Sequence, residues 1–179
     1  MKLRAMMMIL PVAWCVAATA QEKVFRSNEV TESALIDALT PKQSAAPRTR
    51  GLKVESVTDK PVVSKPAKAS LLITFETNSA ELTPQARQVL DKVGRALTDS
   101  SLAEFRFNIE GHADPRGGHE FNERLSLARA DSARKYLMEK YQIGEARLNA
   151  IGKGDSELIN TQDPTAPENR RVTIVTLQN

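Results

Sequence analysis

The region after residue 70 alternates between apolar and polar positions in the regular patterns of strands and helices. Residues Leu71 to Phe75 form a short run rich in β-favouring side chains, which predicts a strand. Thr83 followed by Pro84 is typical of a helix start, with a threonine N-cap and a proline at the first helical position. The helix is predicted to continue through apolar residues spaced three and four apart, which are Ala86, Val89, Leu90, Val93 and Leu97.

One strand, one loop and one long helix are predicted next. Phe105, Phe107 and Ile109 alternate with polar residues, as in a strand with one buried face. A polar loop follows over residues 111–118, and residues 121–141 have the pattern of a long amphipathic helix. Its apolar stripe is expected to contain Phe121, Leu125, Ala128, Ser132, Tyr136 and either Met138 or Glu139.

Short apolar runs at residues 148–151 and 172–175 complete the pattern as two more strands. The predicted order is β-α-β-α-β-β within residues 70–179. This order predicts an α+β fold, a two-layer sandwich with two helices packed on one face of a mixed sheet.

The first 20 residues have the features of a secretory signal peptide. Lys2 and Arg4 give a basic start, residues 5–20 carry no charge, and Ala18-Thr19-Ala20 matches a cleavage site. A membrane anchor is the alternative. However, a spanning helix needs about 20 apolar residues, and the uncharged run over residues 5–20 is shorter. We predict cleavage after Ala20, no transmembrane segment in the mature chain, and a periplasmic protein associated with the cell wall or outer membrane.

Cys15 is the only cysteine, and it lies inside the predicted leader. Lipid attachment at Cys15 stays open, although Trp14 precedes it where lipoprotein processing prefers a small residue. Cleavage after Ala20 leaves no thiol in the mature chain. This excludes disulfides, a Cys-ligated zinc site and a Cys nucleophile.

Residues 21–69 separate the leader from the predicted domain. Residues 21–40 form a short N-terminal segment, in which residues 27–39 have the apolar spacing of a helix. Such a helix is too short to be stable alone, so it docks on another surface or stays loose. Residues 41–69 contain four prolines and several basic residues, and are predicted to be an extended Pro/Lys-rich linker.

The net charge of +3 does not indicate a nucleic-acid-binding domain. Residues 21–69 hold 9 basic and 6 acidic residues, whereas residues 70–179 hold 14 basic and 16 acidic residues. The predicted domain is therefore slightly acidic, which does not provide the basic surface that phosphate binding requires.

A carboxylate and a guanidinium mark the candidate site. Asp114 lies just past a predicted strand, in a loop with glycines that permit a sharp turn. Asn122, Ser126 and Arg129 share one face of the following helix. An Asp and an Arg set apart can hold the ammonium and carboxylate of a zwitterion. The alternative is an ordinary ion pair that orients the loop, and Arg170 can bring another cation to the same edge.

Four ordered motifs resemble the OmpA-like peptidoglycan-binding domain, which also occurs in Pal lipoproteins and MotB stator proteins. The resemblance covers residues 70–179 and implies a βαβαββ fold that binds the peptide stem of peptidoglycan without covalent attachment. The motifs are Phe75-Glu76-Thr77-Asn78-Ser79-Ala80-Glu81-Leu82-Thr83, Ile109-Glu110-Gly111-His112-Ala113-Asp114, Phe121-Asn122 with Leu125-Ser126-Leu127-Ala128-Arg129-Ala130, and Asn169-Arg170-Arg171-Val172.

The resemblance implies a role for each matching residue. Asp114 corresponds to the residue that holds the ammonium of meso-diaminopimelate, and Arg129 to the one that holds its carboxylate. Two departures, Ala113 for a frequent Thr and Glu76 for a frequent Asp, put individual contacts in doubt without removing this clamp. The site is expected to be shaped further by Asn78, Asn122, Leu125 and Arg170.

Two rival functions follow from other residues. An enzyme or metal site would use His112, Asp114, His119 and Glu120, but their spacing matches no catalytic or metal motif. We therefore predict no catalysis, metal or cofactor, with His112 a hydrogen-bonded structural residue, His119 exposed and Glu110 on the surface. The other rival is an envelope protein–protein adaptor that uses residues 27–39 or the outer face of the sheet.

Overall fold

The computed structural model describes residues 24–26, 28–41, 66–76 and 78–177. The predicted signal peptide, its cleavage site, Cys15 and most of the predicted linker lie outside the described residues. Among the residues described, no helix combines the length and the apolar character needed to cross a membrane.

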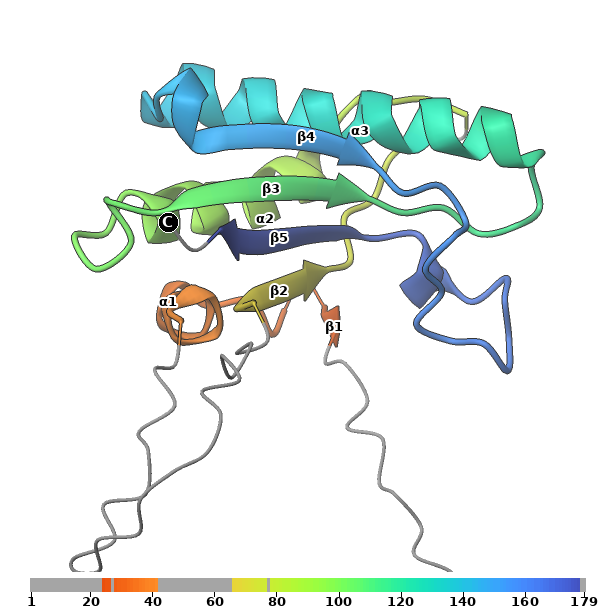
Figure 1. Ribbon diagram of the computed structural model, residues 1–179, viewed down its shortest axis with the longest axis horizontal. Helices are drawn as coiled ribbons and strands as arrows, with labels where there is room; N and C mark the ends of the chain where they lie inside the picture. The colour runs from red at the N-terminus through yellow and green to blue at the C-terminus, as the bar shows by residue number, and fades with distance from the viewer. Residues whose placement is uncertain (1–23, 27, 42–65, 77, 178–179) are drawn as a thin grey trace, which may run out of the picture.

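A five-stranded sheet forms the centre of the fold, in the order β1-β2-β5-β3-β4 (Figure 1). β5 runs antiparallel to both β2 and β3, whereas β1 is parallel to β2 and β4 is parallel to β3. The predicted α+β sandwich with a mixed sheet is confirmed. The strands are β1 Val24–Phe25, β2 Lys68–Leu71, β3 Arg106–Gly111, β4 Leu148–Gly152 and β5 Val172–Leu177.

Helices α2 (Pro84–Leu97) and α3 (His119–Tyr141) lie behind the sheet in Figure 1. α2 begins as predicted, because the Thr83 side chain accepts a hydrogen bond from the Ala86 amide at 3.1 Å and Pro84 follows it. Every residue of its predicted apolar stripe is buried, so the face that the spacing identified is the one that packs on the sheet.

The predicted strand over residues 71–75 is displaced toward the N-terminus. β2 ends at Leu71, and the chain then leaves the sheet, with Phe75 forming an isolated bridge to Leu82. Ile73 is nevertheless 3% exposed. The apolar run beyond Leu71 thus reflects burial in the core and not pairing with another strand.

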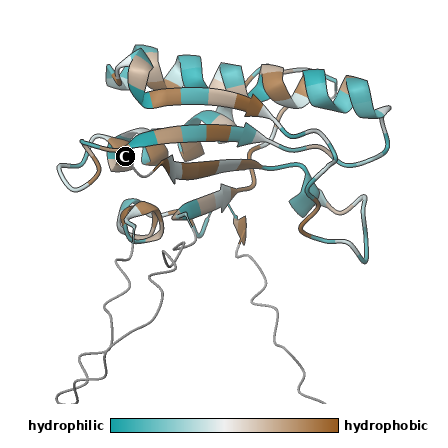
Figure 2. Cartoon of the chain, in the orientation of Figure 1, coloured by the Kyte–Doolittle hydropathy of each residue, from teal (hydrophilic) through white to brown (hydrophobic). Residues whose placement is uncertain are grey.

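The predicted apolar stripe of α3 is correct only toward the end of the helix, where Tyr136 and Met138 pack against the core. Phe121 is 41% exposed and Ala128 is exposed. A Cβ atom at Gly111 would lie 2.1 Å from the Ser126 carbonyl oxygen, which shows how closely α3 packs on the sheet. Small and polar residues fit this close approach, and the outer surface of the helix is largely hydrophilic (Figure 2). Its buried residues are Asn122, Ser126, Ala130, Ala133 and Leu137.

The N-terminal segment is part of the same core. α1 (Glu32–Leu39) begins later than predicted and buries Leu35 and Leu39 completely. The Thr176 hydroxyl of β5 donates a 2.6 Å hydrogen bond to the Leu39 carbonyl. The short strand β1 was not predicted. The apolar face of the helix is thus covered by its own domain and is not presented to a partner.

Candidate functional site

A cavity of about 850 Å³ lies beside the loops that follow β2 and β3. Its wall combines the loop after β2, the loop after β3, the first turns of α3 and the segment before β5. All six residues predicted for the site line this cavity, although they come from four separate parts of the chain: Asn78, Asp114, Asn122, Leu125, Arg129 and Arg170.

The Asp114 carboxylate is 6% exposed and is held by two guanidinium groups. Arg116 donates from Nε to Oδ1 at 3.0 Å and from Nη2 to Oδ2 at 2.8 Å. Arg170 Nη1 donates to Oδ2, also at 2.8 Å. The Arg116 hydrogen bonds, followed by that of Arg170, hold the pKa of Asp114 well below its usual range. The carboxylate is therefore ionised at neutral pH.

Arg116 was not assigned a role from the sequence. Its only signal is its position two residues after Asp114, which lets its side chain fold back in a local bidentate contact. The Arg116 side chain is 61% exposed, compared with 7% for that of Asp114. Arg116 thus covers the carboxylate from the solvent side, where rotation of its side chain would uncover Asp114.

Arg129 reaches the cavity from α3 without touching a carboxylate. Its Nε donates to the Ser79 carbonyl at 3.0 Å and its Nη2 to the Glu76 carbonyl at 3.4 Å. Its guanidinium carbon lies 5.0 Å from the centre of the Phe75 ring. Burial lowers the pKa of Arg129. Among the described residues Arg129 has no salt bridge, so the alternative of an Asp114–Arg129 ion pair is not found.

Asn122 supports the loop that carries Asp114. Its Nδ2 donates to the Asp114 carbonyl at 3.0 Å and to the Gly117 carbonyl at 3.3 Å. A Cβ atom at Gly117 would lie 2.4 Å from Asn122 Oδ1, so the close approach requires a glycine there. Asn78 adopts a left-handed backbone with φ of 54°, which asparagine tolerates better than most residues.

Asn169 organises the wall of the cavity that precedes β5. It belongs to the last of the four motifs, but the sequence indicated no role for it. Its side chain is fully buried and accepts hydrogen bonds from the amides of Ile159 and Asn160 at 2.9 and 3.0 Å. Its Nδ2 donates to three carbonyls of the same loop, the shortest contacts being 2.9 Å to Asn160 and Pro164. Asn169 thereby fixes the backbone from which Arg170 extends toward Asp114.

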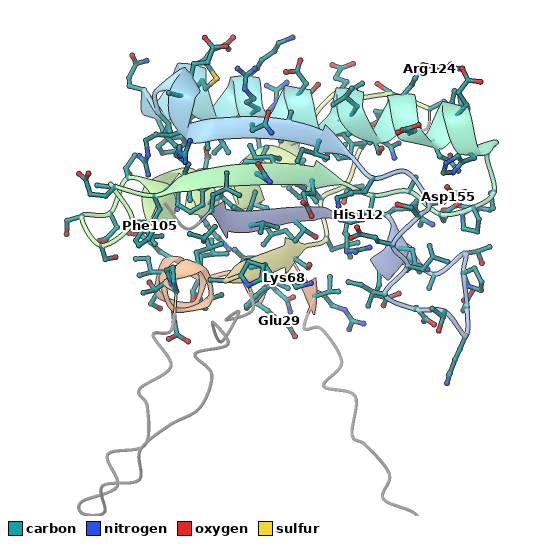
Figure 3. The ribbon with its side chains drawn as sticks, viewed as in Figure 1. Glu29, Lys68, Phe105, His112, Arg124 and Asp155 are labelled. Atoms are coloured by element: carbon teal, nitrogen blue, oxygen red, sulfur yellow. The ribbon has the colours of Figure 1, made fainter. Side chains whose placement is uncertain are left out.

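The two histidines have opposite environments. His119 is exposed, as predicted, and its Nδ1 lies 2.6 Å from Asp155 Oδ1. His112 is 2% exposed, and the prediction that it is hydrogen-bonded is wrong, because neither ring nitrogen has a partner in the part of the chain that the structure describes. Burial lowers the pKa of His112 to about 3, aided by the nearby charge of Arg171. Figure 3 places His112 and Asp155 at the same end of the sheet.

The lining of the cavity is rich in positive charge. Four arginines face it, namely Arg116, Arg129, Arg170 and Arg171, against the carboxylates of Glu76 and Asp114. The Asp114 carboxylate and the Arg129 guanidinium thus place two groups of opposite charge at separate points of the cavity, with no ion pair between them. The cavity can therefore bind a zwitterion, and its excess of guanidinium groups favours a ligand with additional carboxylates.

Comparison with known sequences matches residues 74–172 to the model of the OmpA family. Outer membrane protein Omp38 of Acinetobacter baumannii is 34% identical over 107 residues, which are 56% of this chain and 30% of that protein. The peptidoglycan-associated lipoprotein of Pseudomonas aeruginosa is 32% identical over 100 residues, 55% of this chain and 57% of that protein. The chain thus spans less than a third of the first relative and somewhat more than half of the second.

Solved structures share the fold. The periplasmic domain of Helicobacter pylori MotB superposes with a TM-score of 0.55 at 18% identity, covering 64% of this chain and 77% of that one. The peptidoglycan-associated lipoprotein of Burkholderia pseudomallei gives a TM-score of 0.50 at 24% identity, covering 60% and 89%. At these identities the likeness concerns the arrangement of helices and strands.

Proposed function

Because the chain belongs to the OmpA family, we propose that its cavity binds peptidoglycan non-covalently through the diaminopimelate of the stem peptide. The observation that carries this proposal is the convergence of Asp114 and Arg129 on one cavity without a bond between them. Diaminopimelate offers a side-chain ammonium beside a carboxylate. The ammonium would take the Asp114 end and the carboxylate the Arg129 end.

Arg129 is suited to an anionic group. Its two hydrogen bonds go to backbone carbonyls, so its positive charge is oriented by neutral groups and not cancelled by an acid. A ligand carboxylate that reaches Arg129 in this half-buried position would lose little to competition with water. The name of the Pseudomonas aeruginosa relative, a peptidoglycan-associated lipoprotein, supports peptidoglycan as the polymer that is bound.

Asp114 would bind the ammonium by exchanging partners. Arg170 approaches from the wall of the cavity, whereas the exposed Arg116 occupies the solvent side. An incoming ammonium would displace Arg116 and leave the Arg170 contact in place. The displaced Arg116 guanidinium, whose side chain is already 61% exposed, would then turn to solvent.

This binding would anchor the protein in the bacterial envelope. The relatives named above are an outer membrane protein and a peptidoglycan-associated lipoprotein, which supports a location at the wall or outer membrane. The protein acts as a non-catalytic member of the family. The N-terminal leader, if cleaved after Ala20, would deliver the domain to the periplasm with the linker before it.

The test is co-sedimentation of the purified protein with diaminopimelate-type sacculi. Asp114→Ala and Arg129→Ala should each weaken binding by about 2–5 kcal/mol, because each leaves a ligand charge without its partner. Matched controls are Asp99→Ala and Arg124→Ala, which remove a half-buried Asp and an exposed Arg outside the cavity. Both controls should sediment like the wild type.

A second experiment is needed to identify the stem-peptide residue that the cavity recognises. Sacculi with lysine in place of diaminopimelate keep the ammonium and lose the side-chain carboxylate, so they should bind weakly. Equal sedimentation with both types would contradict diaminopimelate recognition while leaving wall binding in place. Sedimentation that is unchanged in Asp114→Ala and Arg129→Ala would contradict the cavity as the binding site.

A further inference from the structure

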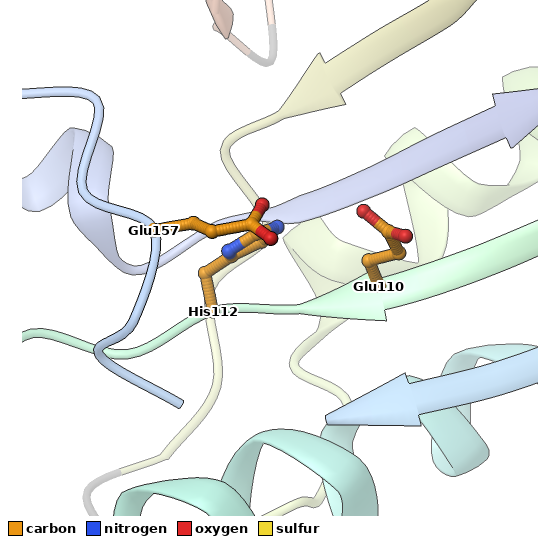
Figure 4. A group of neighbouring side chains, drawn as sticks. All are labelled: Glu110, His112 and Glu157. Carbon is orange, nitrogen blue, oxygen red and sulfur yellow. The ribbon is translucent and has the colours of Figure 1, made fainter. Parts of the chain in front are cut away.

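Three side chains with metal-ligating atoms converge beside the end of β3 (Figure 4). Glu110 lies on β3, His112 follows the strand, and Glu157 belongs to the loop after β4. Their ligand atoms, two carboxylate oxygens and one ring nitrogen, all lie within 4.8 Å of one another. Residues 110 and 112 are two apart in extended chain, so their side chains project to the same side of the sheet.

His112 is the member of this group that needs a partner. It is 2% exposed, and among the described residues neither Nδ1 nor Nε2 has a hydrogen-bond partner. An unsatisfied buried polar group destabilises a fold, so such groups are rare and call for a bound partner. Its ring lies beside the two carboxylates of the cluster, so an imidazole nitrogen lone pair is available to a cation held there.

The two carboxylates supply the charge that a cation requires. The Glu110 side chain is 14% exposed, whereas that of Glu157 is 52% exposed and free to adjust. Lys153 Nζ now lies 2.7 Å from Glu157 and 3.8 Å from Glu110. The Lys153 ammonium thus lies near both carboxylates at the edge of the site, and it can turn to solvent when another cation enters.

We propose that Glu110, His112 and Glu157 form a binding site for one divalent transition-metal ion, with zinc as the ion of best fit. Zinc is bound by histidine nitrogen and by carboxylate oxygen, and three protein ligands leave a fourth position for water. Calcium and magnesium prefer oxygen ligands throughout, so the imidazole disfavours them. The charges of Lys68 and Arg171 also act on this cluster and limit the affinity.

The ion would join the loop after β3, which borders the cavity, to the loop after β4. The His112 amide donates to the Arg171 carbonyl at 2.9 Å, and Arg171 Nη1 donates to the Glu157 carbonyl at 3.1 Å. Asp114 lies two residues beyond His112 on the same loop. A metal bridge between β3 and the loop after β4 would therefore stiffen the backbone that carries Asp114. Sequence motifs miss this site because Glu157 is remote from the other two ligands.

The test uses the full chain with Cys15→Ser, which removes its one thiol, and Zn²⁺ alone as the ligand. Calorimetric titration should show one saturable ion per chain, and the melting temperature should rise with zinc concentration. The chain has two histidines, so NMR can separate them. The ring signals of His112 should shift at one equivalent of zinc while those of His119 stay in place.

Two variants locate the ion. Glu157→Gln should reduce zinc affinity at least tenfold, whereas Glu145→Gln, a control that removes a carboxylate 78% exposed, should leave it unchanged. Lys153→Gln should increase the affinity, because it removes the competing ammonium. The proposal is overturned if the parent chain shows no saturable binding, if Glu157→Gln binds zinc as tightly as the parent, or if only His119 responds.

Discussion

The Arg116 guanidinium covers the Asp114 carboxylate through two hydrogen bonds, of 3.0 and 2.8 Å. A ligand ammonium therefore meets a carboxylate that already has a partner. The two residues belong to one short loop, so the pairing forms locally and needs no movement of the sheet. Arg116 thus competes with the proposed ligand from within the site.

This relationship predicts that Arg116→Gln strengthens wall binding. Replacing the guanidinium frees the outer side of Asp114, while Arg170 still holds the carboxylate. We expect the affinity for diaminopimelate-type sacculi to rise about threefold to tenfold, equivalent to about 0.7–1.4 kcal/mol. Binding isotherms of the two proteins at one salt concentration provide the measurement. A weaker complex would instead mean that Arg116 contacts a ligand carboxylate.

The burial of α1 predicts that the N-terminal segment stabilises the domain. Leu35 is completely buried between α1 and the rest of the core. Leu35→Ala should lower the free energy of unfolding by about 2–4 kcal/mol, because it removes buried methyl groups and leaves a cavity. Urea denaturation measures this loss, and Ser33→Ala, on the exposed side of α1, is the control. An unchanged midpoint would show that α1 is detached in solution.

Local patterns predicted the parts of this fold that depend on local interactions. The cap at Thr83 and the stripe of α2 were identified because each signal lies within a few residues. The buried face of α3 was not, because it depends on the close approach of that helix to Gly111. Side-chain spacing cannot report such backbone contact between distant segments.

The candidate site shows the same division between local signals, which the sequence reveals, and contacts that depend on the folded structure. Motifs identified which residues line the cavity, including Asp114 and Arg129. They did not identify the partners of those residues, since the Arg116 contact depends on how a loop folds back. The unsatisfied ring of His112 was equally hidden, because hydrogen bonding in the core depends on three-dimensional packing.

The contact between His119 and Asp155 predicts a pH-dependent contribution to stability. The hydrogen bond and charge of Asp155 raise the pKa of His119. A raised folded-state pKa stabilises the fold below the unfolded value of about 6.5, and this stabilisation is lost as the pH rises through the folded value. The melting temperature of His119→Gln should fall below that of the wild type at pH 5.5 and match it at pH 9.

Titration by NMR gives an independent measurement of the same pair. The His119 pKa should exceed 6.5 and should fall in Asp155→Asn. Because the His119 side chain is 70% exposed, added salt should weaken the effect. A His119 pKa that is unaffected by Asp155→Asn would contradict the pairing.

The close packing of α3 on the sheet predicts that Gly111 does not tolerate a side chain. A Cβ atom there would lie 2.1 Å from the Ser126 carbonyl, and a backbone atom cannot move aside as a side chain would. Gly111→Ala should therefore destabilise the domain by about 1–3 kcal/mol or more, because α3 must shift away from β3. Gly144→Ala is the matched control, since a Cβ atom at Gly144 meets nothing within 4 Å.

The same shift of α3 would carry Arg129 away from Asp114, so Gly111→Ala should also weaken sacculus binding at temperatures where it remains folded. Retention of full stability and binding in Gly111→Ala would contradict the packing that sets the distance between Asp114 and Arg129.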